Sequence, residues 1–306
     1  MADVILTHPD LARKTLMKVV PAYSEKMQNF YKRLGAKELR TTQSFEDMMS
    51  ESAFPLPPVV NESNGIPLAD FQTMFRRSYT WRKRGLGYAA SSEKVQTDQY
   101  GVIDRTAQKL ARSFNWGMEV EYHNAFNLGF TSFTTADGLP WFSTAHLLES
   151  GTASNRGIVT PTGTVDVVLS YSGVNQALAE LQLQVGHKGE PLPAMGPFRL
   201  HVNPRNGWIA NTLVESAGRA GTSDNDTNVL KGQISMVNST PYLTSSTAWF
   251  LTMEDDSMTG LFCLKMRDMS VRTTYVERLD RFEYYGTQIY RVWAHDWRNS
   301  WGTTGA

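Results

Sequence analysis

The chain has 306 residues, 41% of them hydrophobic and 20% charged, which is enough to bury one large core or two ordinary ones. Thirty Lys and Arg balance thirty Asp and Glu, so the chain lacks the surplus of positive charge that a nucleic-acid condenser needs. A single cysteine, Cys263, excludes an internal disulfide framework. No stretch has the ~20 apolar residues of a membrane span, and no signal peptide is evident. We expect a soluble protein of a reducing compartment.

Residues 8–34 predict two short helices. Pro9 and Pro21 suit first helical positions, and Gly35 suits a helix end. Apolar residues then recur at three- and four-residue steps, at Tyr23, Met27, Phe30, Tyr31 and Leu34. Residues 11–40 contain eight Lys or Arg and two Glu. Two interpretations stay open: a solvated face on a helix that packs on the core, or a basic arm that lies across a partner.

Residues 41–84 predict an extended excursion. Three prolines in residues 54–60 disfavour a helix, and Asn64–Gly65 is a turn signal. Residues 71–84 combine β-favouring aromatic residues with five cations and predict a hairpin-like segment. The segment has too few aliphatic residues for a core of its own, so it must lie against something else. Contact with a partner protein is favoured over a solvated hairpin and over nucleic acid, because both faces of such a strand are charged.

The strongest helix prediction covers residues 101–128. One apolar stripe runs along it at Ile103, Ala107, Leu110, Ala111, Phe114 and Met118. Residues 137–161 predict a loop. Helices are then expected at 169–185 and 208–217, and strands at 198–202, 234–237, 248–251, 260–266, 271–277 and 287–297. The pattern is a mixed α+β chain without internal repeats.

Most signatures of catalysis and cofactor binding are absent from the sequence. Gly85–Ala90 is half a dinucleotide fingerprint in the wrong context. Glu119, Glu121 and His123 alternate on a predicted helix and so point in different directions, which favours a solvated face over a metal site. Acidic residues 254–256 favour a solvated turn over calcium binding. Ser143 and His146 resemble a fragment of a hydrolase triad, although a histidine that caps local backbone is the favoured interpretation.

Residues 137–155 carry a family resemblance. The run Asp137-Gly138-Leu139-Pro140-Trp141-Phe142-Ser143-Thr144-Ala145-His146, followed by Gly151 to Asn155, resembles a segment of tailed-phage major capsid proteins, above all Mu-like major head subunits. That family usually has proline after the histidine, where this chain has Leu147. Later blocks at residues 203–205, 221–232 and 238–251 also resemble the family, so the resemblance spans roughly residues 100–297.

The resemblance implies the Hong Kong 97-type capsid fold, with an N-terminal arm, an extended β-hairpin loop, a peripheral domain with a long spine helix, and an axial domain. On this chain the parts would be residues 1–45 for the arm, 46–90 for the loop, 91–149 for the peripheral domain, 150–265 for the axial domain, and 266–306 for a return to the peripheral domain and the C-terminus.

The implied function is that of a major head protein. It would assemble into pentamers and hexamers of an icosahedral shell around double-stranded DNA, in the virion, with portal and scaffolding proteins and possible decoration proteins as partners. No enzyme activity, cofactor, metal or membrane contact is expected. The alternative is an encapsulin-like compartment of the same fold that encloses cargo enzymes.

Two sets of residues are expected to serve assembly. Hinges between the body and its loop are expected at Gly65, Gly85 and Gly87. Contacts between subunits are expected at Tyr23, Met27, Phe30, Arg76, Arg77, Tyr79, Trp81, Arg82, Lys83 and Arg84.

Overall fold

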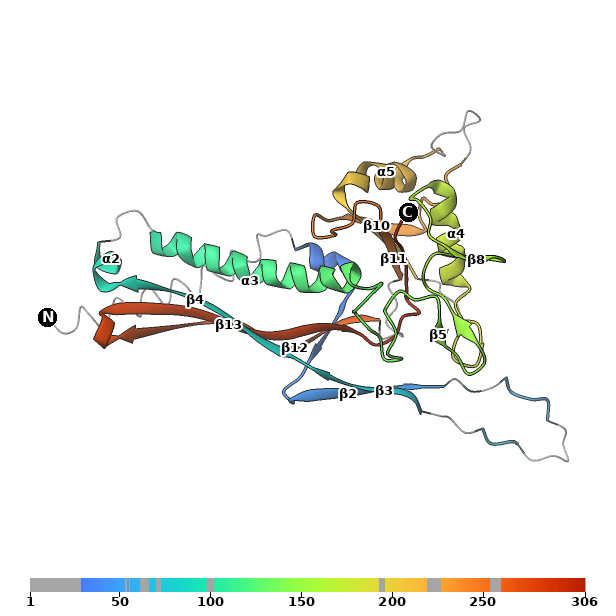
Figure 1. Ribbon diagram of the computed structural model, residues 1–306, viewed down its shortest axis with the longest axis horizontal. Coiled ribbons are helices and arrows are strands. Elements are labelled where there is room, and N and C mark those ends of the chain that lie inside the picture. Colours follow the sequence, from blue (N-terminus) through green and yellow to red (C-terminus); the bar gives the residue numbers. More distant parts are fainter. Residues whose placement is uncertain are drawn as a thin grey trace.

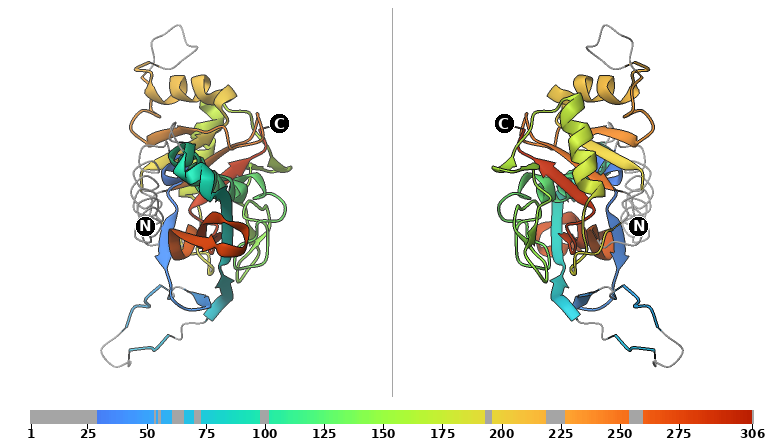
Figure 2. Two further views of the ribbon diagram at one scale, coloured as in Figure 1. Left: turned by 90° about the vertical axis from the view of Figure 1, so that its left-hand side faces the viewer. Right: turned by 90° about the vertical axis from the view of Figure 1, so that its right-hand side faces the viewer.

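The computed structural model describes residues 29–52, 54, 56–60, 66–69, 73–97, 102–192, 196–218, 227–253 and 260–305. These form an elongated α+β molecule with two main sheets (Figure 1). A long, twisted sheet lies beside one long helix, and a compact sheet flanked by two helices lies at one end of it (Figures 1 and 2). No helix among the described residues is both long and apolar enough to cross a membrane.

The long sheet has the strand order β1-β12-β13-β4. Its strands are β1 (Lys37–Arg40), β12 (Leu261–Val276), β13 (Arg281–Ala294) and β4 (Arg82–Ser91). β1 pairs in parallel with the start of β12, and the other pairs are antiparallel. The short helix η2 (Glu277–Leu279) closes the β12–β13 hairpin. Two strands were expected at 260–266 and 271–277. They are one strand instead, because register shifts between Lys265 and Ser270 absorb the break in alternation.

Helix α3 (Val102–Asn127) lies along the long sheet (Figure 1), which confirms the predicted helix at 101–128. Its apolar stripe is buried at Ala107, Leu110, Ala111, Phe114 and Met118. The short helix α2 (Ser92–Gln96) precedes it, with the Ser91 side chain accepting a hydrogen bond from the Lys94 N–H. Helix η1 (Phe30–Leu34) ends at Gly35 with φ 74°, the left-handed helix stop expected from the sequence. The rest of the predicted arm helices lies outside the described residues.

The compact sheet has the strand order β10-β9-β11-β14. Its strands are β9 (Phe198–Val202), β10 (Ile234–Ser239), β11 (Trp249–Met253) and β14 (Ser300–Thr303). Helices α4 (Tyr171–Gln182) and α5 (Pro204–Glu215) pack on it around a core that includes Leu200, Trp249 and Trp301. α5 begins four residues before the expected start, because Pro204 occupies the first turn and the Asn203 side chain caps it.

The expected domain boundaries differ from the course of the chain in two places. The boundary at residue 265 falls inside β12, which is one continuous strand. The C-terminal segment was expected in the peripheral domain, but β14 pairs with β11 and so belongs to the compact sheet. The expected loop at 137–161 holds only two short hairpins, β5 (His146–Leu147) with β6 (Thr152–Ala153) and β7 (Ile158–Thr160) with β8 (Gly163–Val165).

An extended excursion leaves the body between β1 and β4. Strands β2 (Phe45–Glu51) and β3 (Thr73–Thr80) pair with each other and protrude from the long sheet (Figure 1). The described residues between them belong to no helix or strand. The extended character predicted for residues 71–84 is confirmed. β3 joins β2 while β4 joins β13, so the antiparallel β2–β3 pair agrees with the extended β-hairpin loop implied for residues 46–90.

The two glycines expected to act as hinges lie inside a paired strand. Gly85 and Gly87 stand opposite Thr287 and Tyr285 in the β4–β13 ladder. A Cβ atom at Gly87 would lie 2.7 Å from the carbonyl oxygen of Tyr284, whereas a Cβ at Gly85 would lie 3.6 Å from its nearest neighbour. The residues before and after these two glycines in β4 are also paired with β13, so the ladder constrains both glycines. Gly85 and Gly87 are therefore not hinges, and Gly65 lies outside the described residues.

Gly87→Ala and Gly85→Ala form a matched pair of variants on one strand. We expect Gly87→Ala to lower the free energy of unfolding by about 1–3 kcal/mol, because the added methyl group has no space. Gly85→Ala should change it by less than about 1 kcal/mol. Urea unfolding of both variants checks this, and equal effects would contradict the packing described for β4.

Candidate assembly surfaces

The extended loop presents a run of apolar side chains to solvent. Leu56 is 91% exposed and Leu68 is 97% exposed, and the other large apolar residues of the run are Phe54, Val59, Val60 and Ile66. Exposed apolar residues on soluble proteins are usually scattered, and a contiguous set marks a contact surface. Burying each of these side chains against another surface would contribute about 1.5–3 kcal/mol to the free energy of that contact. The loop is therefore the most conspicuous contact surface of the described chain.

Three members of the predicted contact set are occupied within the chain itself. Arg77 donates hydrogen bonds to the carbonyl oxygens of Thr134, at 2.8 Å, and of Thr135. Tyr79 is completely buried, and its hydroxyl lies 2.7 Å from Nδ1 of His295. The prediction that Tyr79 contacts another subunit was wrong, because no part of its side chain reaches the surface. Arg84 forms an ion pair with Glu121 on α3.

The rest of the set is distributed along the base of the loop. Arg76 forms an exposed ion pair with Asp47 of β2, at 2.6 Å. Trp81 is half-buried and donates its indole N–H to the Gln43 carbonyl oxygen, at 2.9 Å. Arg82 and Lys83 are exposed on β4, the last strand of the long sheet among the described residues. Arg82 and Lys83 are thus the cations of this run that remain available for contact.

The arm residues expected at interfaces are only partly described. Tyr23 and Met27 lie outside the described residues. Phe30 is half-buried and packs edge-to-face against Tyr242, with ring centroids 6.2 Å apart. Phe30 therefore contacts the body of its own chain.

Two exposed tryptophans were missed by sequence reasoning. Trp116 on α3 is 59% exposed and Trp208 on α5 is 78% exposed. Trp116 lies off the buried stripe of α3, at a helical position shared with the exposed Arg112 and Val120. A search of the predicted helix for aromatic residues outside its apolar stripe would have found it. Both side chains are candidates for contact with another subunit.

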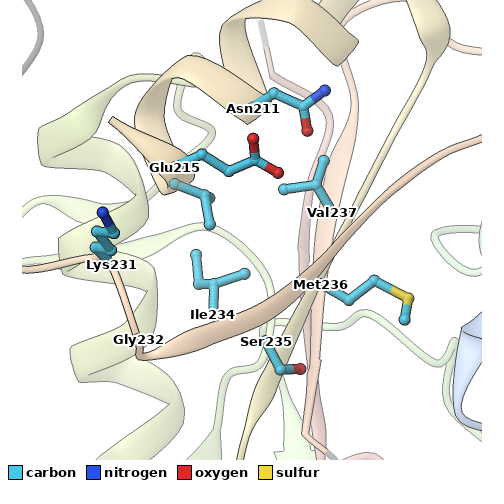
Figure 3. Close-up of a pocket in the computed structure, with 9 residues that line it drawn as sticks. Asn211, Glu215, Lys231, Gly232, Ile234, Ser235, Met236 and Val237 are labelled. Carbon is cyan, nitrogen blue, oxygen red and sulfur yellow. The ribbon is translucent and has the colours of Figure 1, made fainter. Parts of the chain in front are cut away.

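A pocket of about 360 Å³ opens between α5 and β10 (Figure 3). Asn211 and Glu215 line it from the helix, and Lys231, Ile234 and Met236 line the opposite side. Charged and apolar side chains alternate around it, and no set of three metal-ligating side chains occurs among the described residues. The pocket is an open groove at the edge of the compact sheet and shows no catalytic constellation.

The residues that carried the family resemblance form a buried polar cluster. His146 is completely buried, with Nδ1 2.6 Å from Oδ2 of Asp137 and Nε2 3.1 Å from Oδ1 of Asn155. The imidazole ring stacks on Trp297 at 4.3 Å between ring centroids. Both ring nitrogens therefore face oxygen atoms of other side chains.

Asn155 joins the cluster to three separate backbone segments. Its Nδ2 lies within hydrogen-bond distance of the carbonyl oxygens of Trp141, Trp297 and Ser300, at 2.8, 3.2 and 3.2 Å. Its Oδ1 accepts the N–H of Ser143 at 2.9 Å. The side chain is completely buried, so each of these bonds replaces one that water would otherwise make. The cluster therefore fixes the junction where β14 approaches the loop after α3.

The cluster does not form a hydrolase triad. The Ser143 hydroxyl accepts a hydrogen bond from the Ala145 N–H at 3.3 Å. His146 uses both ring nitrogens on Asp137 and Asn155, so neither is directed at a nucleophile. The favoured interpretation, a histidine that caps local backbone, was also wrong in detail, because its partners are two side chains.

The other polar groups singled out from the sequence are divided between the interior and the surface. Glu119 and His123 are buried, whereas Glu121 reaches the surface beside Arg84, so the solvated face expected for these residues was wrong for two of them. Acidic residues 254–256 lie outside the described residues.

The ionised form of Asp137 is stabilised. Burial, the largest influence, raises the pKa of this carboxyl group, but hydrogen bonds from His146, Thr135 and the Leu139 N–H outweigh it and hold the pKa below 3.8. A lowered pKa in the folded state contributes stability above the ordinary pKa, and this stability is lost as pH falls through the folded value.

Asp137→Asn should lower the free energy of unfolding by about 3–5 kcal/mol at pH 7, because it leaves His146 buried without its anionic partner. The difference between Asp137→Asn and the unaltered chain should narrow as pH falls below about 4. Urea unfolding followed by tryptophan fluorescence checks both points. Ser143→Ala is the control and should cost less than about 1 kcal/mol. A constant difference across this pH range would contradict the role given to Asp137.

The family of the chain follows from a match to a family model described as phage capsid protein, which covers residues 76–299. No curated protein sequence matches the chain at a significant level.

Solved structures share the fold at low sequence identity. The capsid of cyanophage P-SCSP1u aligns with 88% of this chain and 85% of its own, with a TM-score of 0.57 and 9% identity. The mature capsid of bacteriophage PhiM1 aligns with 90% and 86%, with a TM-score of 0.53 and 10% identity. The SrpI encapsulin of Synechococcus elongatus PCC 7942 aligns with 92% and 89%, with a TM-score of 0.53 and 9% identity. These structures have the Hong Kong 97-type fold, and this chain shares it. The match to the family model shows that the chain belongs to the phage capsid protein family.

Proposed function

We propose that this protein is the major head protein of a tailed bacteriophage, which self-assembles into the icosahedral shell of the virion. The observation that carries the proposal is the exposed apolar run of the extended loop, in a chain that belongs to the phage capsid protein family. Leu56, Val59 and Leu68 lie exposed in the described part of the chain, and another subunit would cover them in a shell. We assign it a structural role and no enzymatic one.

The shape of the subunit supports rings of copies. The loop and α3 lie on opposite sides of the long sheet (Figure 1). A heterologous contact, in which one face of a subunit meets a different face of the next, closes into rings such as pentamers and hexamers. Interlocking loops bury surface in addition to the body, and obligate interfaces begin at about 2,000 Å². Once some contacts form, the remainder are effectively intramolecular, which makes a shell of moderate contacts stable.

We infer the contents of the shell and the other partners of the protein from the family resemblance. The shell would enclose double-stranded DNA without reading its sequence, because the chain has equal numbers of acidic and basic residues and need not condense DNA itself. Portal, scaffolding and decoration proteins would be its partners. Lys83 and Lys94 lie near the loop, and we assign no covalent cross-link to either.

An encapsulin-like compartment is the second candidate, because one structural neighbour is an encapsulin. The family match favours the phage head over this alternative. The contents of purified particles separate the two, since a phage head holds DNA and has a portal vertex, whereas a compartment holds a cargo protein.

Replacing Leu56, Val59 and Leu68 by serine should abolish shell assembly without unfolding the subunit. These side chains have almost no contacts within the chain, so the circular dichroism spectrum and the midpoint of urea unfolding should be unchanged. Electron microscopy and analytical ultracentrifugation measure assembly.

Leu183→Ser is the matched control, because this side chain is equally apolar and 75% exposed but lies outside the loop, at the end of α4. It should assemble normally. Normal shells from the triple loop variant would contradict the proposed contact.

A further inference from the structure

Helix η1, at the base of the expected arm, is held between the compact sheet and α3. Helix η1 receives a hydrogen bond from Arg199 of β9, whose Nη1 donates to the carbonyl oxygen of Arg33 at 3.1 Å. On its other side, the Tyr31 N–H donates to Oε2 of Glu119 on α3 at 3.0 Å. The Tyr31 ring packs on that of Tyr122, with centroids 4.9 Å apart. η1 thus attaches the chain that precedes it to both halves of the body.

Glu119 is an unusual partner for this attachment. Its side chain is 1% exposed, and Oε1 has no hydrogen-bond partner among the described residues. The carboxyl group forms no ion pair with Lys or Arg among these residues, and its favourable contacts are the backbone N–H groups of Phe30 and Tyr31. A buried carboxylate without a cation pays the full cost of leaving water.

The neighbouring histidine does not supply the missing positive charge. Nδ1 of His123 lies 2.7 Å from the carbonyl oxygen of Glu119, and Nε2 lies 3.1 Å from the hydroxyl of Thr240. A neutral ring satisfies both contacts, with Nδ1–H donating and Nε2 accepting. Burial lowers the pKa of His123 to about 4, so the ring is neutral near pH 7. Its Nδ1 is 3.5 Å from Oε2 of Glu119.

The other titratable groups around η1 keep their charge states between pH 6 and pH 8. Burial raises the pKa values of Tyr31, Tyr242 and Cys263, so these groups stay neutral. Lys265 on β12 forms ion pairs with Glu38 of β1 at 3.0 Å and with Asp268 at 3.1 Å. Arg112, on α3, also acts on Tyr242 and lowers its pKa.

We propose that Glu119 is a proton-dependent latch, which holds the base of the arm to the long helix and loses its proton when η1 detaches. The latch is a conformational device in the single chain and extends beyond the proposed role in a shell. In the attached state the carboxyl group is buried and favours its neutral form. In the detached state it meets water and ionises.

The direction of the pH dependence follows from this difference. Burial raises the pKa of Glu119 to about 7, opposed by the two N–H groups, and exposure to water returns it to about 4.5. Because the attached state binds the proton more tightly, attachment is strongest at acid pH and weakens as pH rises from 4.5 through 7. Between pH 6 and pH 8, the equilibrium constant for detachment should rise about tenfold.

Hydrogen exchange measured by mass spectrometry tests the latch in the full-length protein. The observable is the protection of the backbone amides of residues 30–34, corrected for the intrinsic dependence of exchange on pH. Protection should fall about tenfold between pH 6 and pH 8. Residues 198–202 of β9, whose amides lie in the compact sheet, serve as an internal reference and should show no such fall.

Two variants separate Glu119 from other carboxyl groups. Glu119→Gln keeps the acceptor oxygen but cannot ionise, so the pH dependence of protection should disappear. Glu121→Gln removes a carboxyl group two residues away that pairs with Arg84, and it should leave the dependence intact.

A pH-independent protection in the unaltered chain would overturn the proposal, and so would a dependence that persists in Glu119→Gln. If Glu119→Gln does not fold, the profile of the unaltered chain alone decides. The outcome does not depend on whether the protein forms shells, since the latch lies within one chain.

Discussion

The constraint on which the rest of the molecule depends is the apolar surface that the chain cannot bury by itself. Four hydrophobic clusters stabilise the body, and the two largest lie under α4 and α5 and between α3 and the start of the long sheet. The extended loop has no such core, and Leu56 and Leu68 remain almost fully exposed. Since hydrophobic burial is the main favourable term in association, this surface makes contact between copies favourable. The chain thus consists of a body that buries its own apolar residues and an extended loop whose apolar residues are buried only by a neighbouring subunit.

The extended loop can direct assembly only if the body that carries it is rigid. Asn155 bonds to backbone on both sides of the junction between the loop after α3 and β14, and Arg77 ties the base of the extended excursion to residues 134 and 135. The Asn155 bonds are buried, where an unpaired group costs about 1–3 kcal/mol, and the Arg77 bonds are partly buried. The Arg77 bonds restrict the base of the loop, so less ordering entropy is lost when a neighbour binds.

The sequence predicted the parts of the fold that depend on local pattern. The stripe of α3 repeats with helical period from Ile103 to Met118, and Gly35 has the left-handed conformation that only glycine adopts readily, so both were predicted correctly. Pairing partners were not predictable, because whether β4 joins β3 or β13 depends on contacts some 200 residues apart in the chain. Tyr79 was misjudged for the same reason: its neighbours Phe262, Trp293 and His295 come from β12 and from the end of β13 and beyond. The charged residues beside Tyr79 correctly indicated a strand at the surface. They did not indicate that Tyr79 lies on a buried face of that strand.

A shell made of both pentamers and hexamers requires the same chain to adopt two sets of angles between neighbours. The ladder between β4 and β13 excludes Gly85 and Gly87 as the points of adjustment. The described chain offers two others. One is the β2–β3 ribbon, which pairs with neither main sheet and contains a register shift between Met49 and Glu51. The other is η1, which is held by hydrogen bonds to Arg199 of β9 and to the carboxyl group of Glu119 on α3, whose pKa is about 7. Both lie where the contact segments leave the body, so adjustment there changes the angle between neighbours and leaves both cores intact.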